Sequence, residues 1–170
     1  MQLNHFNTSF PEKKHAVILA CDAVNSPANI GGLFRLADSF GIQKLLFGGT
    51  LVNVNSARLK RTARATQNWI SMEDDLDLVV ELKKIIAEGY MPIALEITKN
   101  SLALNDLKIP KNIKIVVVLG DEQMGISPQV LEICGTHVHI PMYGKNSSMN
   151  VVQAASIALY EITKQLNSYG

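Results

Sequence analysis

The chain has 170 residues, of which 47% are hydrophobic and 18% charged, and its formal net charge is +1. This size and composition fit one compact domain that can bury a continuous core, and they require no second domain. The small net charge neither requires nor excludes a nucleic-acid partner, because phosphate contact depends on where cationic side chains gather.

Apolar runs that indicate strands alternate along the chain with patterns that indicate helices. In chain order we predict strand 16–21, helix 30–40, strand 44–47, helices 56–66 and 76–88, strands 92–97 and 113–119, helix 129–134, strand 137–140 and helix 151–166. Several of these strands are apolar at almost every position, as in a parallel sheet that is covered on both faces. The order predicts an α/β fold with a parallel sheet and helices on both faces.

Capping signals support several of these boundaries. Ser71 with Asp74 matches a capping box in front of helix 76–88, and Gly89 is placed to end that helix. Ser127 followed by Pro128 matches an N-cap and a first helical turn. The acidic residues within 73–77 are therefore interpreted as favourable charge at a helix start and not as a metal site.

The two cysteines and the lack of a long apolar run bear on the compartment. Cys21 and Cys134 lie in or beside apolar runs and form no CxxC pair, which predicts buried thiols in a reducing compartment. No apolar run approaches the roughly 18 residues that a membrane-spanning helix needs. We therefore expect a cytoplasmic protein without a membrane partner.

Three glycine-bearing loops follow apolar runs, at residues 29–32, 120–127 and 141–150. In an open α/β sheet, loops beyond the carboxyl ends of the strands line the ligand crevice, so the three loops predict one site. In the third loop we expect Gly144 to permit unusual backbone angles, and Ser148 and Asn150 to cap the last helix.

Common site motifs are absent from these loops. None contains the GxGxxG dinucleotide fingerprint, the GxxxxGK[ST] phosphate loop or the GxSxG nucleophile elbow. His137 and His139 share one face of a strand, but without nearby carboxylates they are interpreted as an exposed strand face and not as a metal site.

Three stretches together resemble the ordered motifs of a known family. NIGGLFRLADSFGI (residues 29–42), VVVLGDEQMGIS (116–127) and IPMYGKNSSMNVVQAASIALYE (140–161) look like those of the SpoU/TrmH family in the SPOUT superfamily. The resemblance implies an S-adenosyl-L-methionine-dependent RNA 2′-O-ribose methyltransferase, with one SPOUT domain over residues 1–170 and a short N-terminal extension at 1–14. It also implies a C-terminal deep trefoil knot (the SPOUT α/β-knot) and an obligate homodimer whose site takes residues from both subunits.

The resemblance also implies roles for individual residues. Arg35 corresponds to the catalytic arginine, whose rigid fork suits a phosphate next to the reacting ribose. The other implied active-site residues are Asn29, Glu122, Ser148 and Asn150. The implied cofactor-binding residues are Leu95, Gly120, Ile140, Met142, Ser148 and Met149. Structural alternatives stay open: Asn29, Ser148 and Asn150 as helix caps, and Glu122 in an ion pair.

One cationic stretch suits RNA binding. Arg58, Arg61 and Arg64 are spaced by three, so on a helix they share one face and suit successive phosphates, although a merely solvated basic face has the same pattern. Trp69 could stack on a base or lie in the core, and we favour the core.

Structured RNA is thus the expected partner, with tRNA favoured over rRNA, and the short wobble-position enzymes as a third alternative. Two rival interpretations are a non-catalytic RNA-binding module of the same fold and a flavodoxin-like nucleotide-binding domain. The sequence Asn25-Ser26-Pro27 after the first strand, in place of a phosphate loop, argues against the second rival.

Overall fold

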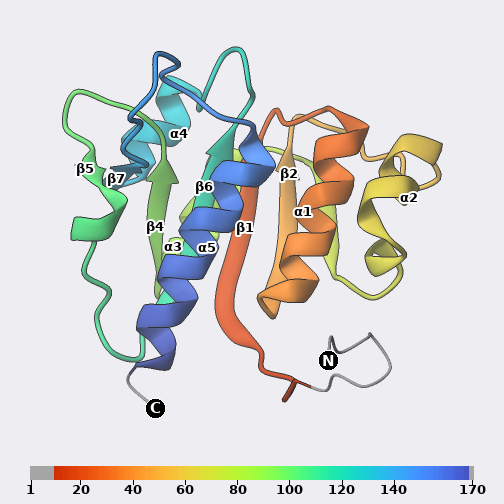
Figure 1. The fold of residues 1–170 in the computed structure, drawn as a ribbon, viewed down its shortest axis with the longest axis horizontal. Coiled ribbons are helices and arrows are strands. Elements are labelled where there is room, and N and C mark those ends of the chain that lie inside the picture. Colours follow the sequence, from red (N-terminus) through yellow and green to blue (C-terminus); the bar gives the residue numbers. More distant parts are fainter. Residues whose placement is uncertain (1–9, 169–170) are drawn as a thin grey trace.

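The computed structural model describes residues 10–168, and its single sheet is parallel (Figure 1). Its strands lie side by side in the order β3 (Met72–Leu76), β2 (Ile42–Gly48), β1 (His15–Asp22), β6 (Lys114–Gly120), β4 (Tyr90–Leu95), β7 (Thr136–His139) and β5 (Leu102–Ala103). Every pairing between neighbouring strands is parallel. The predicted parallel α/β sheet is confirmed.

Helices cover both faces of the sheet. Buried side chains of α1 (Pro27–Ser39), α2 (Ala57–Ala63) and α5 (Val151–Asn167) join one apolar cluster, and those of α3 (Leu78–Ala87) and α4 (Pro128–Ile133) join the other. Figure 1 shows α1 and α5 in front of the sheet and α3 behind it. In β1, Val17 and Leu19 face the first cluster and Ile18 and Ala20 the second, because side chains alternate along a strand. Two short 3₁₀ turns, η1 (Thr66–Asn68) and η2 (Leu104–Asp106), complete the fold.

Two edge strands, β3 and β5, were not predicted from the sequence. The predicted capping box is wrong, because Ser71 and Asp74 lie before and within β3, and Asp77 is the residue that caps α3 by accepting a bond from the Val80 N–H over 3.1 Å. In β3, Glu73 pairs with Lys44 on β2, with 2.8 Å between Nζ and Oε1. The acidic stretch is thus mainly a charged edge strand, and charge on an edge discourages pairing with another chain.

Trp69 does not lie in the core, which corrects the prediction. Helix α2 ends at Ala63, because Arg64 and Ala65 adopt left-handed backbone angles with φ of 54° and 72°. The chain then turns through η1, and the Trp69 side chain remains 59% exposed.

The two histidines of β7 are partly buried and hydrogen-bonded, so the prediction of an exposed strand face is wrong. His137 contacts Thr98 Oγ1 through Nδ1 at 3.1 Å and the Leu131 carbonyl through Nε2 at 3.0 Å. His139 contacts Ser101 Oγ through Nδ1 at 3.0 Å. Both rings therefore fasten β7 to the segment that follows β4.

Other local predictions are confirmed. Cys21 and Cys134 are buried free thiols, Ser127 and Pro128 begin α4, and Gly89 follows α3 with φ of 90°. Residues 10–14 have no regular secondary structure, and the rest of the predicted N-terminal extension lies outside the described residues. Within residues 10–168, no helix is both long and apolar enough to cross a lipid bilayer.

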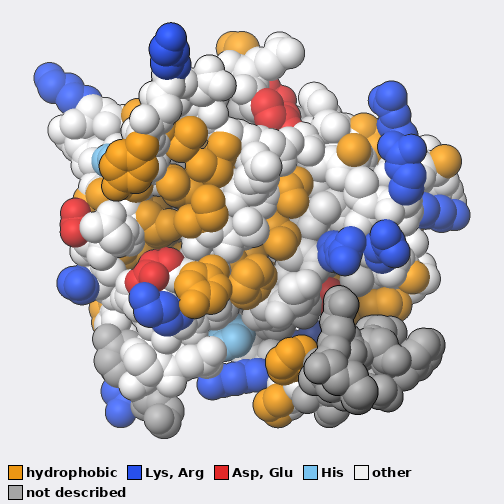
Figure 2. Space-filling view, viewed as in Figure 1, with side chains coloured by type: hydrophobic (Ala, Val, Ile, Leu, Met, Phe, Trp, Pro, Cys, Tyr) orange, Lys and Arg blue, Asp and Glu red, His pale blue; other side chains and the backbone are white. Residues whose placement is uncertain are grey.

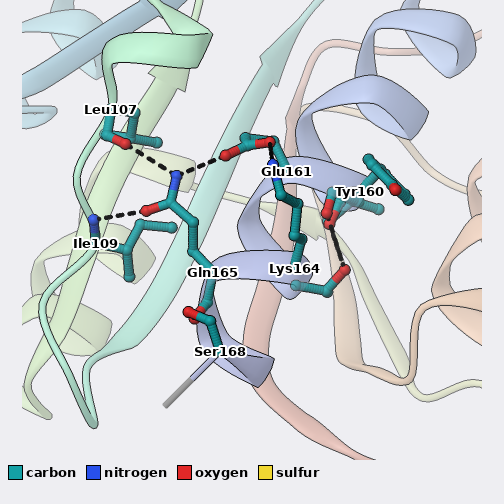
Figure 3. Close-up of polar contacts among 9 residues, drawn as sticks. Leu107, Ile109, Tyr160, Glu161, Lys164, Gln165 and Ser168 are labelled. Atoms are coloured by element: carbon teal, nitrogen blue, oxygen red, sulfur yellow. Dashed lines mark hydrogen bonds and ion pairs between the residues drawn. The ribbon is translucent and has the colours of Figure 1, made fainter.

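The carboxyl-terminal half of α5 is fastened to the chain segment between η2 and β6 (Figure 3). Gln165 donates from Nε2 to the Leu107 carbonyl over 2.9 Å, and its Oε1 accepts from the Ile109 N–H over 3.0 Å. One side-chain amide thus bonds two backbone groups of this segment. The same Nε2 also donates to Glu161 over 2.8 Å.

Candidate active site

A cavity of about 550 Å³ lies at the carboxyl ends of β4, β6 and β7, under the loops at the top of Figure 1. The volume falls within the roughly 300–1,000 Å³ typical of small-molecule sites. Six residues predicted to hold a cofactor all line it, namely Leu95, Gly120, Ile140, Met142, Ser148 and Met149. The fold therefore gathers residues that are up to 54 positions apart in the sequence (149 minus 95).

The loop after β6, residues 121–127, forms one wall of this cavity and is held by its own first residue. Asp121 Oδ1 accepts the N–H groups of Gln123 and Met124 over 2.9 and 3.0 Å, and the Gly125 N–H bonds to the Asp121 carbonyl over 2.9 Å. These backbone N–H groups favour the charged carboxylate and hold the pKa of Asp121 below its usual value. The turn therefore has a fixed shape although Glu122, Gln123 and Met124 are exposed.

Two further carboxylates, which the sequence analysis missed, fasten the far end of the same loop. Glu96 accepts the Ile97 N–H at Oε1 over 2.9 Å and the Ile126 N–H at Oε2 over 3.1 Å. Asp22 accepts the Ser127 N–H at Oδ2 over 2.7 Å. The available signal was an acidic residue at the end of an apolar strand, where orphan backbone donors of the next loop need acceptors.

Glycine is required where this loop meets β6. A Cβ on Gly120 would lie 2.3 Å from the Gly125 carbonyl carbon, and one on Gly125 would lie 2.6 Å from Glu96 Oε2. Gly125 also has φ of 68°. A Cβ on Gly144, in contrast, would meet no atom within 4 Å, and Gly144 is not among the residues with positive φ, so its predicted unusual backbone angle is wrong.

A chain of side-chain hydrogen bonds joins all three motif segments, although residues 29–32 lie in the first turns of α1 and not in a loop as predicted. Asn150 donates from Nδ2 to Asn29 Oδ1 over 3.0 Å, and Asn29 in turn donates from Nδ2 to Glu122 Oε1. The Asn150 side-chain oxygen accepts the Val152 N–H over 2.9 Å, so Asn150 caps α5, as predicted. Three residues predicted for the active site are thus brought into direct contact.

The structural alternatives for these residues are resolved by the same contacts. Asn29 is not a helix cap, because α1 begins at Pro27 with Ser26 as its N-cap. Glu122 has no ion pair among the described residues and instead accepts from Asn29. Ser148 lines the cavity, is exposed and caps no helix, which corrects the prediction that it caps α5.

A second hollow of about 700 Å³ lies on the other side of the 121–125 loop. Its polar lining includes Asn25, Ser26, Asn29 and Gln123, and Glu122 lines both hollows. Because Glu122 lines both hollows, its contact with Asn29 lies at the wall that the two hollows share.

The hydrogen bonds at His139 determine which ring nitrogen carries a proton. Ser101 Oγ donates its only proton to the Thr98 carbonyl over 2.9 Å, so it must accept from His139 Nδ1–H. In the neutral ring, Nε2 is then a hydrogen-bond acceptor. His139 lines the cavity, and nothing in its sequence context indicated this.

Comparison with known proteins adds to this geometry. The model of the SpoU rRNA methylase family matches residues 16–160. The chain belongs to the SpoU rRNA methylase family.

Two relatives of this SpoU chain differ in the RNA that their names specify. The tRNA (guanosine(18)-2′-O)-methyltransferase of Aquifex aeolicus is 26% identical over 172 residues, which covers 99% of this chain and 79% of the relative. The 23S rRNA (guanosine(2553)-2′-O)-methyltransferase of Bacillus subtilis is 28% identical over 157 residues, which covers 89% of this chain and 61% of the relative. The SpoU chain thus spans most of the first relative and less than two thirds of the second.

Solved structures share the fold over nearly the whole chain. The crystal structure of the A. aeolicus TrmH/SpoU tRNA modifying enzyme matches with a TM-score of 0.80 at 25% identity, covering 92% of this chain and 78% of that one. The AdoMet-bound rRNA methyltransferase from Sinorhizobium meliloti matches with a TM-score of 0.82 at 23% identity, covering 91% and 58%. The overall fold is therefore shared with these two solved structures.

The remaining predicted residues of the SpoU chain do not line either hollow. Arg35 lies on α1, six residues beyond Asn29 and thus about 9 Å further along the helix axis. Its side chain is exposed and has no hydrogen bond or ion pair within the described residues. Arg58 and Arg61 are exposed on α2, and Arg64 forms its left-handed C-cap, so the three do not continue one regular helix face as predicted.

Proposed function

We propose that this protein is an RNA methyltransferase that transfers a methyl group from S-adenosylmethionine to a ribose 2′-hydroxyl. The observation that carries the proposal is the meeting of the three motif segments, where the Asn150–Asn29–Glu122 contacts adjoin the cavity lined by the six predicted cofactor residues. Such a site can hold one small molecule in a fixed position beside a polar group that faces a second ligand.

The residues of the cavity fit S-adenosylmethionine. Ile140, Met142 and Leu95 supply apolar surface for a purine, and the exposed backbone of 141–149 supplies polar groups for its edge. His139 Nε2 adds a hydrogen-bond acceptor. When bound, the cofactor would supply an electrophilic methyl group on a sulfonium for transfer to the ribose O2′, with the neutral thioether as leaving group.

The protein's contribution is to position the ribose and to help its hydroxyl lose a proton. Arg35 holds the phosphate next to the target ribose, and an oxygen of that phosphate accepts the proton, because the guanidinium itself stays charged. Asn29 and Glu122 contact the ribose from the second hollow, and Ser148 and Asn150 support it from the cofactor side. Arg35→Ala should abolish transfer and leave cofactor binding about unchanged; retained turnover contradicts the assignment.

A homodimer completes the site in this proposal, because Arg35 does not line the cavity of its own chain. Exposed apolar side chains on α5, namely Ile157 and Tyr160, support a subunit contact, and Figure 2 shows apolar side chains gathered over α5 and the neighbouring β4–β7 side. Arg35→Ala subunits mixed with Asn150→Ala subunits should show more transfer than either variant alone, since one site of the heterodimer is then intact. No recovery contradicts a shared site.

The favoured substrate is tRNA, with rRNA as the alternative. The A. aeolicus relative, which covers 99% of this chain, is named for a tRNA guanosine, whereas the B. subtilis relative is named for 23S rRNA. Incubating the protein with labelled S-adenosylmethionine and separated tRNA and rRNA from cells that lack its gene, and then mapping the labelled ribose, identifies the substrate. Label on a base refutes the 2′-hydroxyl assignment.

Calorimetry with S-adenosylmethionine separates this proposal from its rivals. A flavodoxin-like domain should not bind it, and a non-catalytic module of the same fold should bind RNA without transferring the label.

The two buried free cysteines support a reducing, cytoplasmic location.

We include a deep trefoil knot in the proposal. Strand β7 lies between β4 and β5 in the sheet, although β4 and β5 are consecutive in the sequence. After β7, the chain continues into α5, and Gln165 of α5 bonds to Leu107 and Ile109 in the segment between η2 and β6. When the chain is pulled from both ends, a tightened knot should retain some residues. The extended length should therefore be below the roughly 3.3–3.6 Å per residue of a free chain. Pulling between the N-terminus and Gly135 should reach full length; full extension in both cases contradicts the knot.

A further inference from the structure

Trp69 is the only tryptophan of the chain, and it is held rigidly at the surface. Its side chain is 59% exposed, yet its indole N–H donates to Asp38 Oδ1 over 2.7 Å. A surface tryptophan without such a bond could rotate, whereas this ring is fixed to α1 by its polar edge. More than half of its surface is thus left open to a ligand.

The backbone in front of Trp69 is shaped to place it there. Arg64 and Ala65 are two successive non-glycine residues with left-handed angles, a conformation that ordinary side chains disfavour. They end α2, and the η1 turn that follows is closed by the Trp69 N–H bonding to the Thr66 carbonyl over 3.2 Å. Strained positions of this kind gather at ligand sites, because the surrounding structure must hold them in place.

Two exposed arginines lie on the helix and the turn that hold the ring. Arg35 precedes Asp38 by three residues on α1, so both lie on the helix face to which Trp69 is tied. Arg64 lies five residues before Trp69 and is exposed. Neither arginine has a carboxylate within ion-pair distance among residues 10–168. Figure 2 shows several Lys and Arg side chains over α1 and α2.

No aromatic ring or cation of the described chain occupies the faces of Trp69. The ring pair and the cation–π contact between described residues involve Phe34 with Phe47 and Lys114 with Tyr90. A flat apolar surface flanked by free cations suits a nucleobase and its phosphates, since every base offers a π-face and every nucleotide a negative charge.

We propose that Trp69 is a stacking platform for an unpaired nucleobase of the RNA, with Arg35 and Arg64 holding the flanking phosphates. This inference rests on the proposed RNA methyltransferase function. The partner must be unpaired at this point, because a base inside a duplex stacks on its neighbours and cannot cover the indole. Asp38 acts as a positioning residue that fixes the ring.

The emission of Trp69 tests the proposal directly, since no other tryptophan contributes. Titration with bulk tRNA and with a short unpaired RNA oligonucleotide should quench the emission to saturation. The same oligonucleotide annealed to its complement should quench it several-fold less. Equal quenching by duplex, no quenching by tRNA, or an emission change on raising the protein concentration without RNA, which indicates contact with a second copy, would each overturn the proposal.

Variants separate stacking from folding and from chemistry. Trp69→Ala should weaken binding of dye-labelled tRNA roughly 5- to 150-fold, the range for loss of one stacked base. Asp38→Ala should weaken it less. Val80→Ala, at an exposed position on α3 across the sheet, is the matched control and should bind normally. S-adenosylmethionine binding by Trp69→Ala should match the wild type, which shows that the variant is folded.

The same data distinguish the platform from the reaction. If no RNA is methylated but Trp69 emission is quenched by unpaired RNA, the platform stands and the proposed reaction fails. If transfer occurs and Trp69→Ala binds tRNA as the wild type does, the platform is wrong and the reaction stands. Arg64→Ala should in addition reduce the salt dependence of binding by about one phosphate contact, whereas Trp69→Ala should leave that slope unchanged.

Discussion

Asn150 donates a hydrogen bond to Asn29 over 3.0 Å, although the two residues are 121 positions apart in the sequence. The bond connects the start of the last helix to the first turn of α1, and Asn29 in turn donates to Glu122. Both asparagines therefore serve the site through their amide groups, which donate and accept at once.

The two halves of the Asn150 amide can be separated by substitution. Asn150→Ala removes both the cap of α5 and the donor to Asn29, so it should lower the free energy of unfolding by about 0.5–2 kcal/mol and also reduce methyl transfer. Asn150→Asp keeps an acceptor for the Val152 N–H but has no donor for Asn29, so stability should be retained while transfer falls. Urea unfolding and turnover of both variants check this, and equal loss of stability would contradict it.

Glu96 should control the shape of the loop that carries Glu122. Glu96→Ala leaves the Ile126 N–H without its acceptor and should weaken S-adenosylmethionine binding about tenfold or more, from the roughly 1.5–3 kcal/mol typical of a hydrogen bond to a charged group. Glu96→Gln keeps one carbonyl acceptor and should lie between Ala and the wild type. Calorimetry measures this order, and unchanged affinity in Glu96→Ala would show that the loop is held by Asp121 and Asp22 alone.

Two glycines near the cavity should respond oppositely to alanine. Gly120→Ala places a methyl group 2.3 Å from a backbone carbon of the same site, so the loop must move, and both stability and cofactor affinity should fall. Gly144→Ala meets no atom within 4 Å and requires no left-handed backbone, so its free energy of unfolding should stay within about 0.5 kcal/mol of the wild type. Cofactor titration and urea unfolding of the pair provide the comparison.

The buried thiols should be inert in the folded protein and should make it sensitive to alkali. Burial, together with the charge of Asp22, raises the pKa of Cys134 from 9.0 to about 12, and burial raises the pKa of Cys21 as well. In the unfolded chain both thiols ionise near their ordinary pKa, while the folded chain keeps them neutral. The free energy of unfolding should therefore fall as the pH rises from about 9 toward 12, with no contribution from these thiols below 9.

Thiol titration checks this prediction independently. A disulfide reagent at about pH 8 should react with the folded protein only as fast as it opens, and with both thiols at once in denaturant. Rapid reaction of the folded protein would contradict the burial of the two side chains.

The order and nature of most elements follow from the amino-acid sequence alone, because continuous apolar runs such as 115–119 are stable only as strands covered on both faces. Strand β3 could not be predicted in this way, because its sequence MEDDL is typical of a helix start. Only its pairing with β2 makes it a strand. Pairing energy comes from the neighbouring strand, so a short polar edge strand has little signal of its own.

For the site, resemblance identified Asn29, Glu122 and Asn150, but their direct contact became visible only in the folded chain. The same holds for the Glu96 and Asp22 carboxylates that hold the loop, because their backbone donors lie far away in the sequence. It also holds for the surface position of Trp69, whose indole N–H bonds to Asp38 on another helix. Local sequence specifies which side chains carry suitable groups. Packing of the helices and loops against the sheet specifies which of those groups meet, because each contact requires segments far apart in the chain to be ordered together.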